Sequence, residues 1–271
     1  MILVDGQPQD RVSAQDRGLL YGDGLFETVR LVGRAAPLWP RHMRRLAHGC
    51  ERLRLPMPDP ALLWREALAA GEGMAQAVVR ITLTRGTGAR GYAMPATPHA
   101  TRVVAAFPMP ALDASAYRDG IRLHLCATRL AEQPALAGLK HLNRLEQVLA
   151  RAEWDDPAVA EGLLCDARGR VVSAVSANLF AVVDGVPATP ALDRCGVAGV
   201  ARAEVLDALP RAQVRDLPLD ECLRAGELFL TSSVRGILPV QAVGDNVYVP
   251  GPVARALQAH WAALGFPTEQ A

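Results

Sequence analysis

The chain has 271 residues, a length that predicts one large domain or two smaller ones. Half of the residues are hydrophobic and 21% are charged, which excludes disordered, collagen-like and coiled-coil proteins. The 29 basic residues almost balance the 28 acidic ones, and a net charge of +1 gives no reason to expect a nucleic-acid partner.

The apolar runs, the first residues and the spacing of cysteines and histidines predict where the protein is located and whether it binds a metal. The longest apolar runs are far shorter than the ~20 residues that a membrane-spanning helix needs. The first residues include Asp5 and lack the basic start of a signal peptide. The five cysteines are scattered and the six histidines lack the spacing of metal ligands, so neither a disulfide framework nor a metal site is predicted. We therefore expect a cytoplasmic protein with no membrane partner and no metal.

The first part of the chain mixes predicted strands with predicted helices. Asp5 and Gly6 favour a type I′ hairpin turn. From Arg41 on, apolar residues recur at helical spacing, and a second helix is expected after Asp59, whose side chain can cap it. The expected strands are 2–4, 26–32, 77–84 and 101–107, and the expected helices begin at 41 and at 59. This mixture predicts an α+β domain.

A short proline-bearing segment at residues 108–120 is the best candidate for a domain boundary. We therefore expect an N-terminal α+β domain at 1–110 and a C-terminal α+β domain at 111–271. In the latter, Leu142, Leu145 and Leu149 recur at helical spacing and predict a helix. The further expected strands are 121–128, 162–165, 171–175, 179–183 and 227–231, with helices near 201–209 and 252–265.

Residues 86–91 match the spacing G-x-G-x-x-G of dinucleotide-binding proteins. In those proteins the last glycine opens a helix that meets the pyrophosphate, but two prolines follow here and prevent a helix. We therefore expect a glycine-rich loop that presents Arg85, Arg90 and Tyr92.

Lys140 is the only lysine in a chain that is otherwise rich in arginine. Arginine cannot lose its proton in a protein, whereas a lysine amine can become a nucleophile or a base. The alternative is a surface lysine near the start of a helix. The solitary lysine favours a functional role.

Residues 137–147 read Ala-Gly-Leu-Lys-His-Leu-Asn-Arg-Leu-Glu-Gln and resemble the cofactor-lysine segment of the fold-type IV pyridoxal-phosphate enzymes. Further similar segments occur in order at 16–28, 42–46, 177–180, 196–202, 231–233 and 237–240. The segments 137–147 and 85–92 are most similar to the lyase branch, whose members convert 4-amino-4-deoxychorismate into 4-aminobenzoate and pyruvate for folate synthesis. The resemblance implies a two-domain α+β subunit with the cofactor at the domain interface, usually in a homodimer.

The resemblance also implies roles for particular residues. Lys140 would hold pyridoxal phosphate and move protons, and Arg45 would bind the phosphate. As alternatives, Arg45 could belong to a solvated helix face and Asn178 could be a simple turn residue before a strand. The remaining cofactor-binding residues implied are Ser173, Asn178, Val200, Ala201, Ser232 and Ser233. The candidates for binding substrate carboxylates are Arg85, Arg90 and Arg235.

Ser173 departs from the family pattern, because the family normally has a glutamate there that pairs with the pyridine nitrogen of the cofactor. No acidic residue lies between Arg170 and Asn178 to replace it. This departure disfavours transamination but does not exclude an elimination that yields an aromatic product. The alternatives are a D-amino acid or branched-chain aminotransferase, and a non-catalytic binding protein, against which the retained Lys140 argues.

Overall fold

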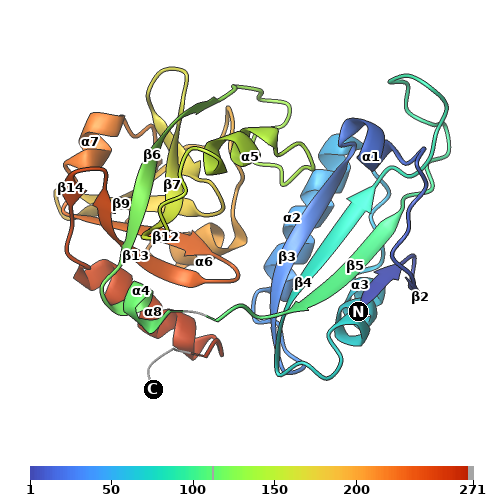
Figure 1. Ribbon diagram of the computed structural model, residues 1–271, viewed down its shortest axis with the longest axis horizontal. Coiled ribbons are helices and arrows are strands. Elements are labelled where there is room, and N and C mark those ends of the chain that lie inside the picture. The colour runs from blue at the N-terminus through green and yellow to red at the C-terminus, as the bar shows by residue number, and fades with distance from the viewer. Residues whose placement is uncertain (112, 268–271) are drawn as a thin grey trace. The chain divides into compact units, whose positions relative to one another are not determined.

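The computed structural model describes residues 1–111 and 113–267 and separates into two compact units. The first unit comprises Met1–Pro110 together with Leu139–Asn143, and the rest of the described chain forms the second (Figure 1). The division predicted from the sequence assigns Lys140 to the second domain. The structure assigns it to the first unit, because its segment pairs with a strand there.

The first unit is built on a five-stranded antiparallel sheet with the strand order β2-β1-β5-β4-β3. Its strands are β1 (Ile2–Val4), β2 (Gln7–Pro8), β3 (Gly24–Val32), β4 (Gln76–Thr84) and β5 (Arg102–Pro108). Asp5 and Gly6 join β1 to β2 with φ angles of 49° and 81°. Two positive φ angles are what a type I′ turn requires, so the predicted hairpin is present.

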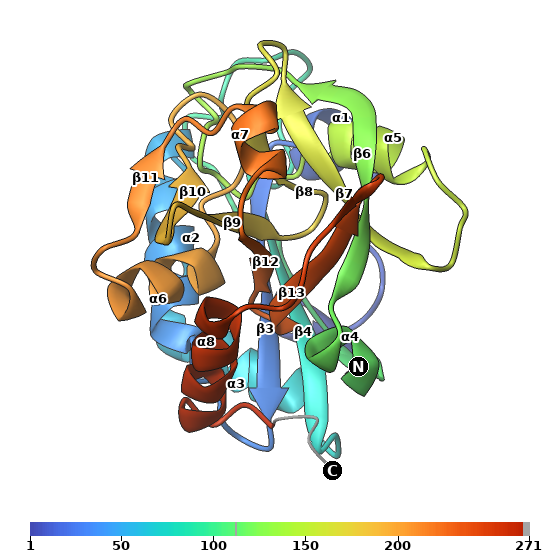
Figure 2. The ribbon, with the colours of Figure 1, turned by 90° about the vertical axis from the view of Figure 1, so that its left-hand side faces the viewer.

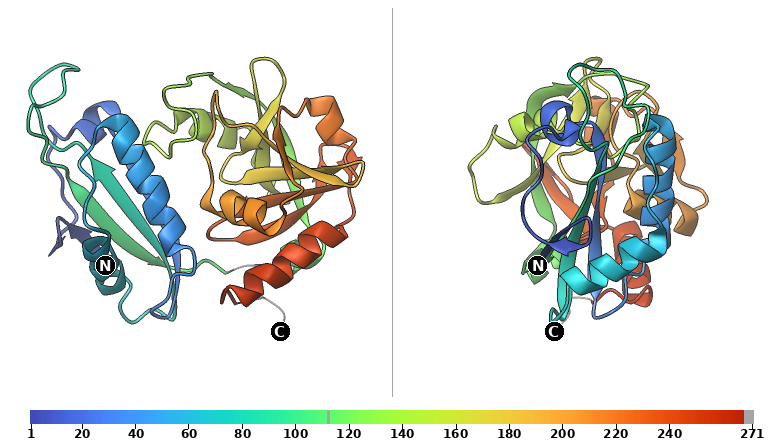
Figure 3. Two further views of the ribbon diagram at one scale, coloured as in Figure 1. Left: turned by 180° about the vertical axis from the view of Figure 1, so that it is seen from behind. Right: turned by 90° about the vertical axis from the view of Figure 1, so that its right-hand side faces the viewer.

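Three helices accompany this sheet: α1 (Arg17–Tyr21), α2 (Trp39–Leu53) and α3 (Pro60–Ala70). Figure 3 shows α2 and α3 on the same face of the sheet. Leu25, Val29 and Leu31 point from β3 to that face and form a buried core with apolar residues of both helices. As expected, Asp59 caps α3, its side chain accepting a hydrogen bond from the Ala61 N–H.

The second unit is built on a nine-stranded sheet with the order β11-β10-β9-β12-β13-β6-β7-β8, and β14 pairs with β13. The neighbours β13, β6 and β7 are parallel, and Figure 2 shows them side by side. The strands are β6 (Ile121–Leu130), β7 (Val159–Asp166), β8 (Val171–Ala174), β9 (Asn178–Val183), β10 (Val186–Pro190), β11 (Gln213–Arg215), β12 (Glu227–Ser232), β13 (Gly236–Val243) and β14 (Asn246–Val247). The sequence analysis does not predict β10, β11, β13 or β14.

The helices of the second unit are α4 (Ala114–Arg118), α5 (Leu145–Arg151), α6 (Val200–Ala208), α7 (Leu219–Leu223) and α8 (Pro252–Ala263). The longest helix of the described chain is α2 with 15 residues, and none there is long and apolar enough to cross a membrane. The predicted helix around Leu142 is shorter than expected, since α5 begins only at Leu145. Leu145 and Leu149 are 75% and 62% exposed, so their helical spacing does not mark a core-facing side.

All five cysteines are buried and none forms a disulfide. Burial raises the pKa of the Cys50 and Cys222 thiols to about 12. These two side chains therefore behave as small apolar groups, as expected from the sequence.

Candidate active site

Main-chain hydrogen bonds join the segment of Lys140 to strand β3. The Phe26 N–H donates to the Lys140 carbonyl at 2.9 Å, and the Leu142 N–H donates to the Gly24 carbonyl at 3.0 Å. Leu25 and His141 form an isolated antiparallel bridge between them. Residues 140–142 are therefore extended rather than helical, which explains the late start of α5. The backbone of the only lysine is fixed by sheet hydrogen bonds.

The ring of Phe26 lies next to two cationic groups. The Lys140 Nζ is 4.2 Å from the ring centroid, and the Arg80 guanidinium carbon is 4.1 Å from it. Phe26 shares a sheet face with Arg80, because Arg80 pairs with Thr28 and alternate residues of a strand face the same side. Each contact is a cation–π interaction. The lysine amine and a guanidinium thus lie near one ring, where they can attract an anionic small molecule.

The next residue, Glu27, points to the opposite face of β3 and is 1% exposed. Its Oε1 accepts a hydrogen bond from the Arg45 Nε at 2.8 Å, and its Oε2 is bonded by the Arg45 Nη2 and by the His42 Nδ1, the latter at 2.6 Å. A buried carboxylate is stable only when it is paired in this way. Glu27 therefore depends on two side chains of α2.

The protonation states in this cluster follow from burial and from the neighbouring charges. Burial acts to raise the pKa of Glu27, but Arg45 and His42 together lower it to about 2. Burial lowers the pKa of His42 against the attraction of Glu27, and the charges of Arg45 and Lys140 lower it further. At neutral pH Glu27 is ionised and His42 is neutral. Because Glu27 can only accept, His42 donates its Nδ1–H.

Arg45 is not part of a solvated helix face, because its side chain is only 12% exposed. Two of its nitrogens bond Glu27. Arg45 therefore has a structural role, which the resemblance to phosphate-binding arginines does not imply. Glu27 is not among the site residues predicted from the sequence, although a carboxylate at a core-facing position of an apolar strand is a readable signal.

In the second unit, Gly199 is the residue before α6 and provides no side-chain cap. The first amides of a helix have no partner within the helix and favour an anion such as a phosphate. Those of Val200 and Ala201 belong to buried residues. A Cβ at Gly199 would lie 2.0 Å from the Asn178 Oδ1, so only glycine fits there. Asn178 is held by a hydrogen bond from its Nδ2 to the Val197 carbonyl at 2.9 Å, and it opens β9 rather than occupying a simple turn.

Thr231 adds a hydroxyl group beside Asn178. The two residues are directly paired between β12 and β9, so their side chains share a face of the sheet. The Thr231 Oγ1 is buried and has no hydrogen-bond partner within the described residues. An orphaned hydroxyl near uncapped helix amides is a donor set that fits a phosphate. The sequence analysis misses Thr231, although it is a polar residue at a buried position of an apolar strand.

Ser232, Ser233 and Ser173 also lie in the second unit. The Ser232 Oγ accepts a hydrogen bond from the Arg235 N–H at 3.0 Å and so shapes the turn that contains Ser233. Ser173 lies on β8 opposite Leu164 and is 8% exposed. Strand β8 reads Val-Val-Ser-Ala and carries no acidic residue. It therefore presents a neutral hydroxyl at this position.

Arg85 has a structural arrangement that is at odds with the substrate-binding role expected for it. It is 2% exposed and pairs with both carboxylate oxygens of Asp23, at 2.8 and 2.9 Å. Its remaining donors bond the carbonyls of Leu53 and Arg54 at 2.8 and 2.9 Å. Arg85 thus secures the end of α2, and the buried guanidinium is not available to a substrate carboxylate.

The glycine-rich loop forms no helix between residues 85 and 98. The buried Arg17 donates to the carbonyls of Gly91 and Tyr92 at 3.0 and 3.3 Å and so holds the loop. Arg90 is exposed on this loop. Its position is compatible with binding a carboxylate.

Arg235 is held by acidic and polar neighbours in the second unit. Its Nη2 bonds the buried Glu161 and donates to the Ser176 Oγ at 2.9 Å. Its side chain is 26% exposed. A substrate carboxylate would have to share this guanidinium with Glu161.

Comparisons with known proteins identify relatives that match this chain over nearly its whole length. Residues 24–243 match the family model described as amino-transferase class IV. The chain is 35% identical to an aminodeoxychorismate lyase of Vibrio harveyi, over 95% of this chain and 98% of that protein. The crystal structure of 4-amino-4-deoxychorismate lyase from Pseudomonas aeruginosa is 46% identical, with a TM-score of 0.92, over 97% of this chain and 98% of that one. These matches confirm the α+β fold class expected from the sequence.

A further solved structure contains a ligand related to the expected cofactor. It is the branched-chain amino acid aminotransferase of T.th. with pyridoxamine 5'-phosphate. That protein is 25% identical to this chain, with a TM-score of 0.84, over 97% of this chain and 93% of that one.

We predict that His42→Gln removes part of the pH dependence of stability. Since the pKa of the folded His42 lies below its ordinary value of 6.5, the unfolded chain binds more protons as the pH falls, and stability is lost below about pH 6.5. Glutamine can still donate to Glu27 but does not titrate. Urea unfolding at pH 8 and at pH 5.5 measures the effect. An equal difference between wild type and variant at both pH values would contradict this assignment.

Proposed function

Because the chain belongs to the class IV amino-transferase family, we propose that it is a pyridoxal-phosphate-dependent lyase acting on 4-amino-4-deoxychorismate. The products are 4-aminobenzoate and pyruvate, and the reaction serves folate biosynthesis. The observation that carries this proposal is the sheet-anchored Lys140, the only lysine of the chain, together with the similarity to lyases over nearly its whole length.

The residues assigned to the cofactor in this proposal are each assigned by their own chemistry. Lys140 supplies the amine for covalent attachment, and Arg45 supplies a guanidinium for the phosphate. The amides of α6 and a set of hydroxyl groups provide further phosphate donors, which suit an anion with several acceptor oxygens. The residues assigned to the cofactor are Lys140, Arg45, Ser173, Asn178, Val200, Ala201, Thr231, Ser232 and Ser233.

The chain's own residues account for the chemistry as follows. Pyridoxal phosphate, when bound, withdraws electrons from the substrate carbon that carries the amino group. The substrate's amino group would release Lys140 from its covalent attachment, and the free Nζ would then take the proton from this carbon as a general base, within the short range that its fixed backbone allows. The bond between the adjacent ring carbon and the enolpyruvyl oxygen would break, this oxygen would take the proton that Lys140 holds so that pyruvate leaves as its enol, and the ring would become aromatic. Aromatisation makes the elimination favourable without a second substrate.

The two carboxylates of the substrate require cationic partners. Arg80 contacts the ring of Phe26, as the Lys140 amine does, and it is the first such partner in this proposal. Arg90, exposed on the loop that Arg17 holds, is the second. Arginine suits this role because its planar guanidinium matches the geometry of a carboxylate.

We predict that Lys140→Ala lowers formation of 4-aminobenzoate from 4-amino-4-deoxychorismate by roughly 10²–10⁴-fold or more, because the variant lacks both the anchor and the base. The visible absorbance of the purified protein should disappear as well. Product is measured by chromatography. Arg224→Ala, a substitution on the exposed surface that is purified and assayed in the same way, is the control and should retain wild-type turnover. Near-normal turnover in Lys140→Ala would refute the assignment.

An aminotransferase acting on D-amino acids or branched-chain amino acids is the alternative, since the family contains such enzymes. Ser173 argues against it. A carboxylate facing the cofactor's ring nitrogen would hold a proton there, because an opposite charge favours the protonated form, whereas a hydroxyl does so weakly. The substrate then retains more negative charge near its own leaving group, which favours elimination.

We predict that Ser173→Glu raises amino transfer from D-alanine relative to formation of 4-aminobenzoate. Ser173→Ala should cost the lyase little, about 1 kcal/mol for one net hydrogen bond. The ratio of the two activities is measured in wild type and in both variants. A ratio that does not differ among the three proteins leaves Ser173 without a mechanistic role.

The protein is also proposed to be a cytoplasmic homodimer. Free buried cysteines suit a reducing compartment. Leu145, Val148 and Leu149 lie three and four residues apart on α5 and are 75%, 60% and 62% exposed. An apolar helix face of this kind is typical of an interface, and a second copy of the chain is the proposed partner.

We predict a particle of twice the 29.0 kDa chain mass in sedimentation experiments. Val148→Glu should shift the particle toward the monomer, because a charge would be buried in the interface. Val247→Glu is the matched control, since Val247 is also exposed, at 76%, but lies on β14. A dimer that is equally stable in both variants would exclude α5 from the interface.

A further inference from the structure

Two loops of the second unit lead directly to groups assigned to the cofactor. Residues 131–138 precede Lys140 by two positions, and residues 191–199 end at the start of α6. The loops are hydrogen-bonded to each other through their main chains. The Gln133 N–H donates to the Arg194 carbonyl at 2.8 Å, and the Gly138 N–H donates to the Gly196 carbonyl at 3.0 Å.

The pairing of the two loops is short and irregular. The Ala198 N–H donates back to the Gly138 carbonyl at 3.0 Å, and Gly138 and Gly196 have φ angles of 80° and 85°. These left-handed conformations suit glycine, which loses more freedom on ordering than other residues. Such a pairing depends on support from outside the loops.

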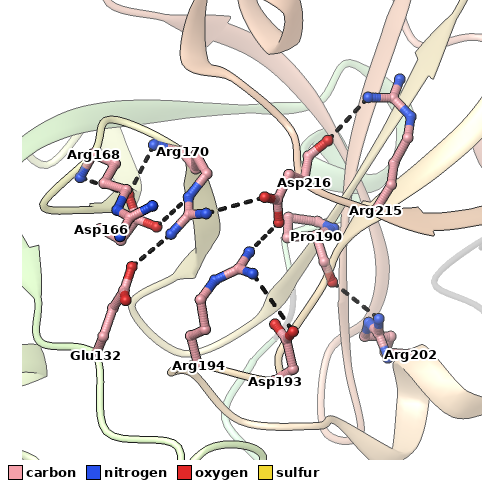
Figure 4. A network of polar contacts seen from close by, with 10 residues as sticks. All are labelled: Glu132, Asp166, Arg168, Arg170, Pro190, Asp193, Arg194, Arg202, Arg215 and Asp216. Atoms are coloured by element: carbon pink, nitrogen blue, oxygen red, sulfur yellow. Dashed lines mark hydrogen bonds and ion pairs between the residues drawn. The ribbon is translucent and has the colours of Figure 1, made fainter.

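Arg170 supplies that support, as Figure 4 shows. Its Nη2 donates to Glu132 at 2.5 Å on the first loop, and its Nε donates to Asp166 at 2.7 Å. Its Nη1 donates to Asp216 at 3.0 Å, and Asp216 in turn bonds Arg194 on the second loop. One guanidinium thus connects both loops to the end of strand β7.

We propose that Arg170 is a positioning residue for the cofactor. It acts by holding residues 131–138 and 191–199 in register, and these loops lead along the chain to Lys140 and to the first amides of α6. This inference uses the assignment of Lys140 and of the α6 amides to the cofactor, but not the identity of the substrate. A network of charged pairs that bridges segments can couple them energetically.

Removal of the Arg170 guanidinium should leave the fold intact. Asp166 is 2% exposed, but it keeps hydrogen bonds from the main-chain N–H groups of Arg168 and Arg170 at 2.9 and 3.0 Å. The side chains of Glu132 and Asp216 are 29% and 44% exposed, so water can solvate them once the pairs are lost. The effect is therefore expected in the loops rather than in the core.

The test is Arg170→Met, with two measurements that do not depend on catalysis. Titration of the cofactor-free protein with pyridoxal phosphate, followed by visible absorbance, should show a dissociation constant raised on the order of tenfold. Hydrogen exchange should show faster exchange of the Gln133, Gly138 and Ala198 amides. Arg170→Lys should restore part of the affinity, because an ammonium group can bond one or two of the three carboxylates.

Arg118→Met is the matched control. Arg118 forms a bidentate pair with Asp119 in the same unit, and the hydrogen bonds of its side chain reach neither loop. It should leave both measurements unchanged. Glu132→Gln, which weakens only the link to the first loop, keeps the test valid if Arg170→Met folds poorly. It should speed exchange at Gln133 and raise the dissociation constant less than Arg170→Met does.

Two results would overturn the proposal. One is an unchanged dissociation constant for pyridoxal phosphate in a folded Arg170→Met protein. If Arg170→Met does not fold, the same result in Glu132→Gln would overturn the proposal. The other is weaker binding without faster exchange in either loop, which would mean that Arg170 does not act through them. Failure of the lyase assignment is a separate outcome, since it would leave both measurements as predicted.

Discussion

The pairing of residues 140–142 with strand β3 is the constraint on which the candidate active site depends. It fixes the backbone of Lys140 through main-chain hydrogen bonds, which involve no side-chain group. The same strand then supplies Phe26 on one face and Glu27 on the other, because successive side chains of a strand alternate. One short piece of β3 therefore positions the lysine amine beside an aromatic ring and holds the helix that carries Arg45.

The charged groups beside this strand form a buried cluster in which each one depends on its partners. Glu27 is ionised because Arg45 and His42 lower its pKa to about 2, and Arg45 is drawn out of solvent by the same pair. Breaking a buried pair of this kind is costly, because one charge is then left without a partner. Arg45 is thus held in place by residues of the first unit alone. In the second unit, the uncapped start of α6 and the unpartnered Thr231 hydroxyl provide donors that involve no net charge.

Much of this arrangement can be predicted from the sequence, and the failures have identifiable physical causes. Strand alternation, the Asp5–Gly6 turn and the cap at Asp59 are local signals, and the structure contains all of them. The lone lysine and its surrounding segment indicate the cofactor chemistry. The extended conformation around Leu142 cannot be read locally, because a distant strand overrides the helical spacing of the leucines. The structural role of Arg85 is hidden for the same reason, since Asp23 and the end of α2 are brought to it only by folding.

The most direct test of the central claim is to locate the cofactor on the chain. Borohydride makes the link between pyridoxal phosphate and a lysine permanent, and mass spectrometry of a tryptic digest then identifies the modified peptide. The account predicts that the peptide of residues 130–144 carries the pyridoxyl group on Lys140, the only lysine present. A pyridoxyl group at the N-terminal amine alone would contradict it, and so would cleavage of coloured, reduced protein after an unmodified Lys140 into the peptides 130–140 and 141–144.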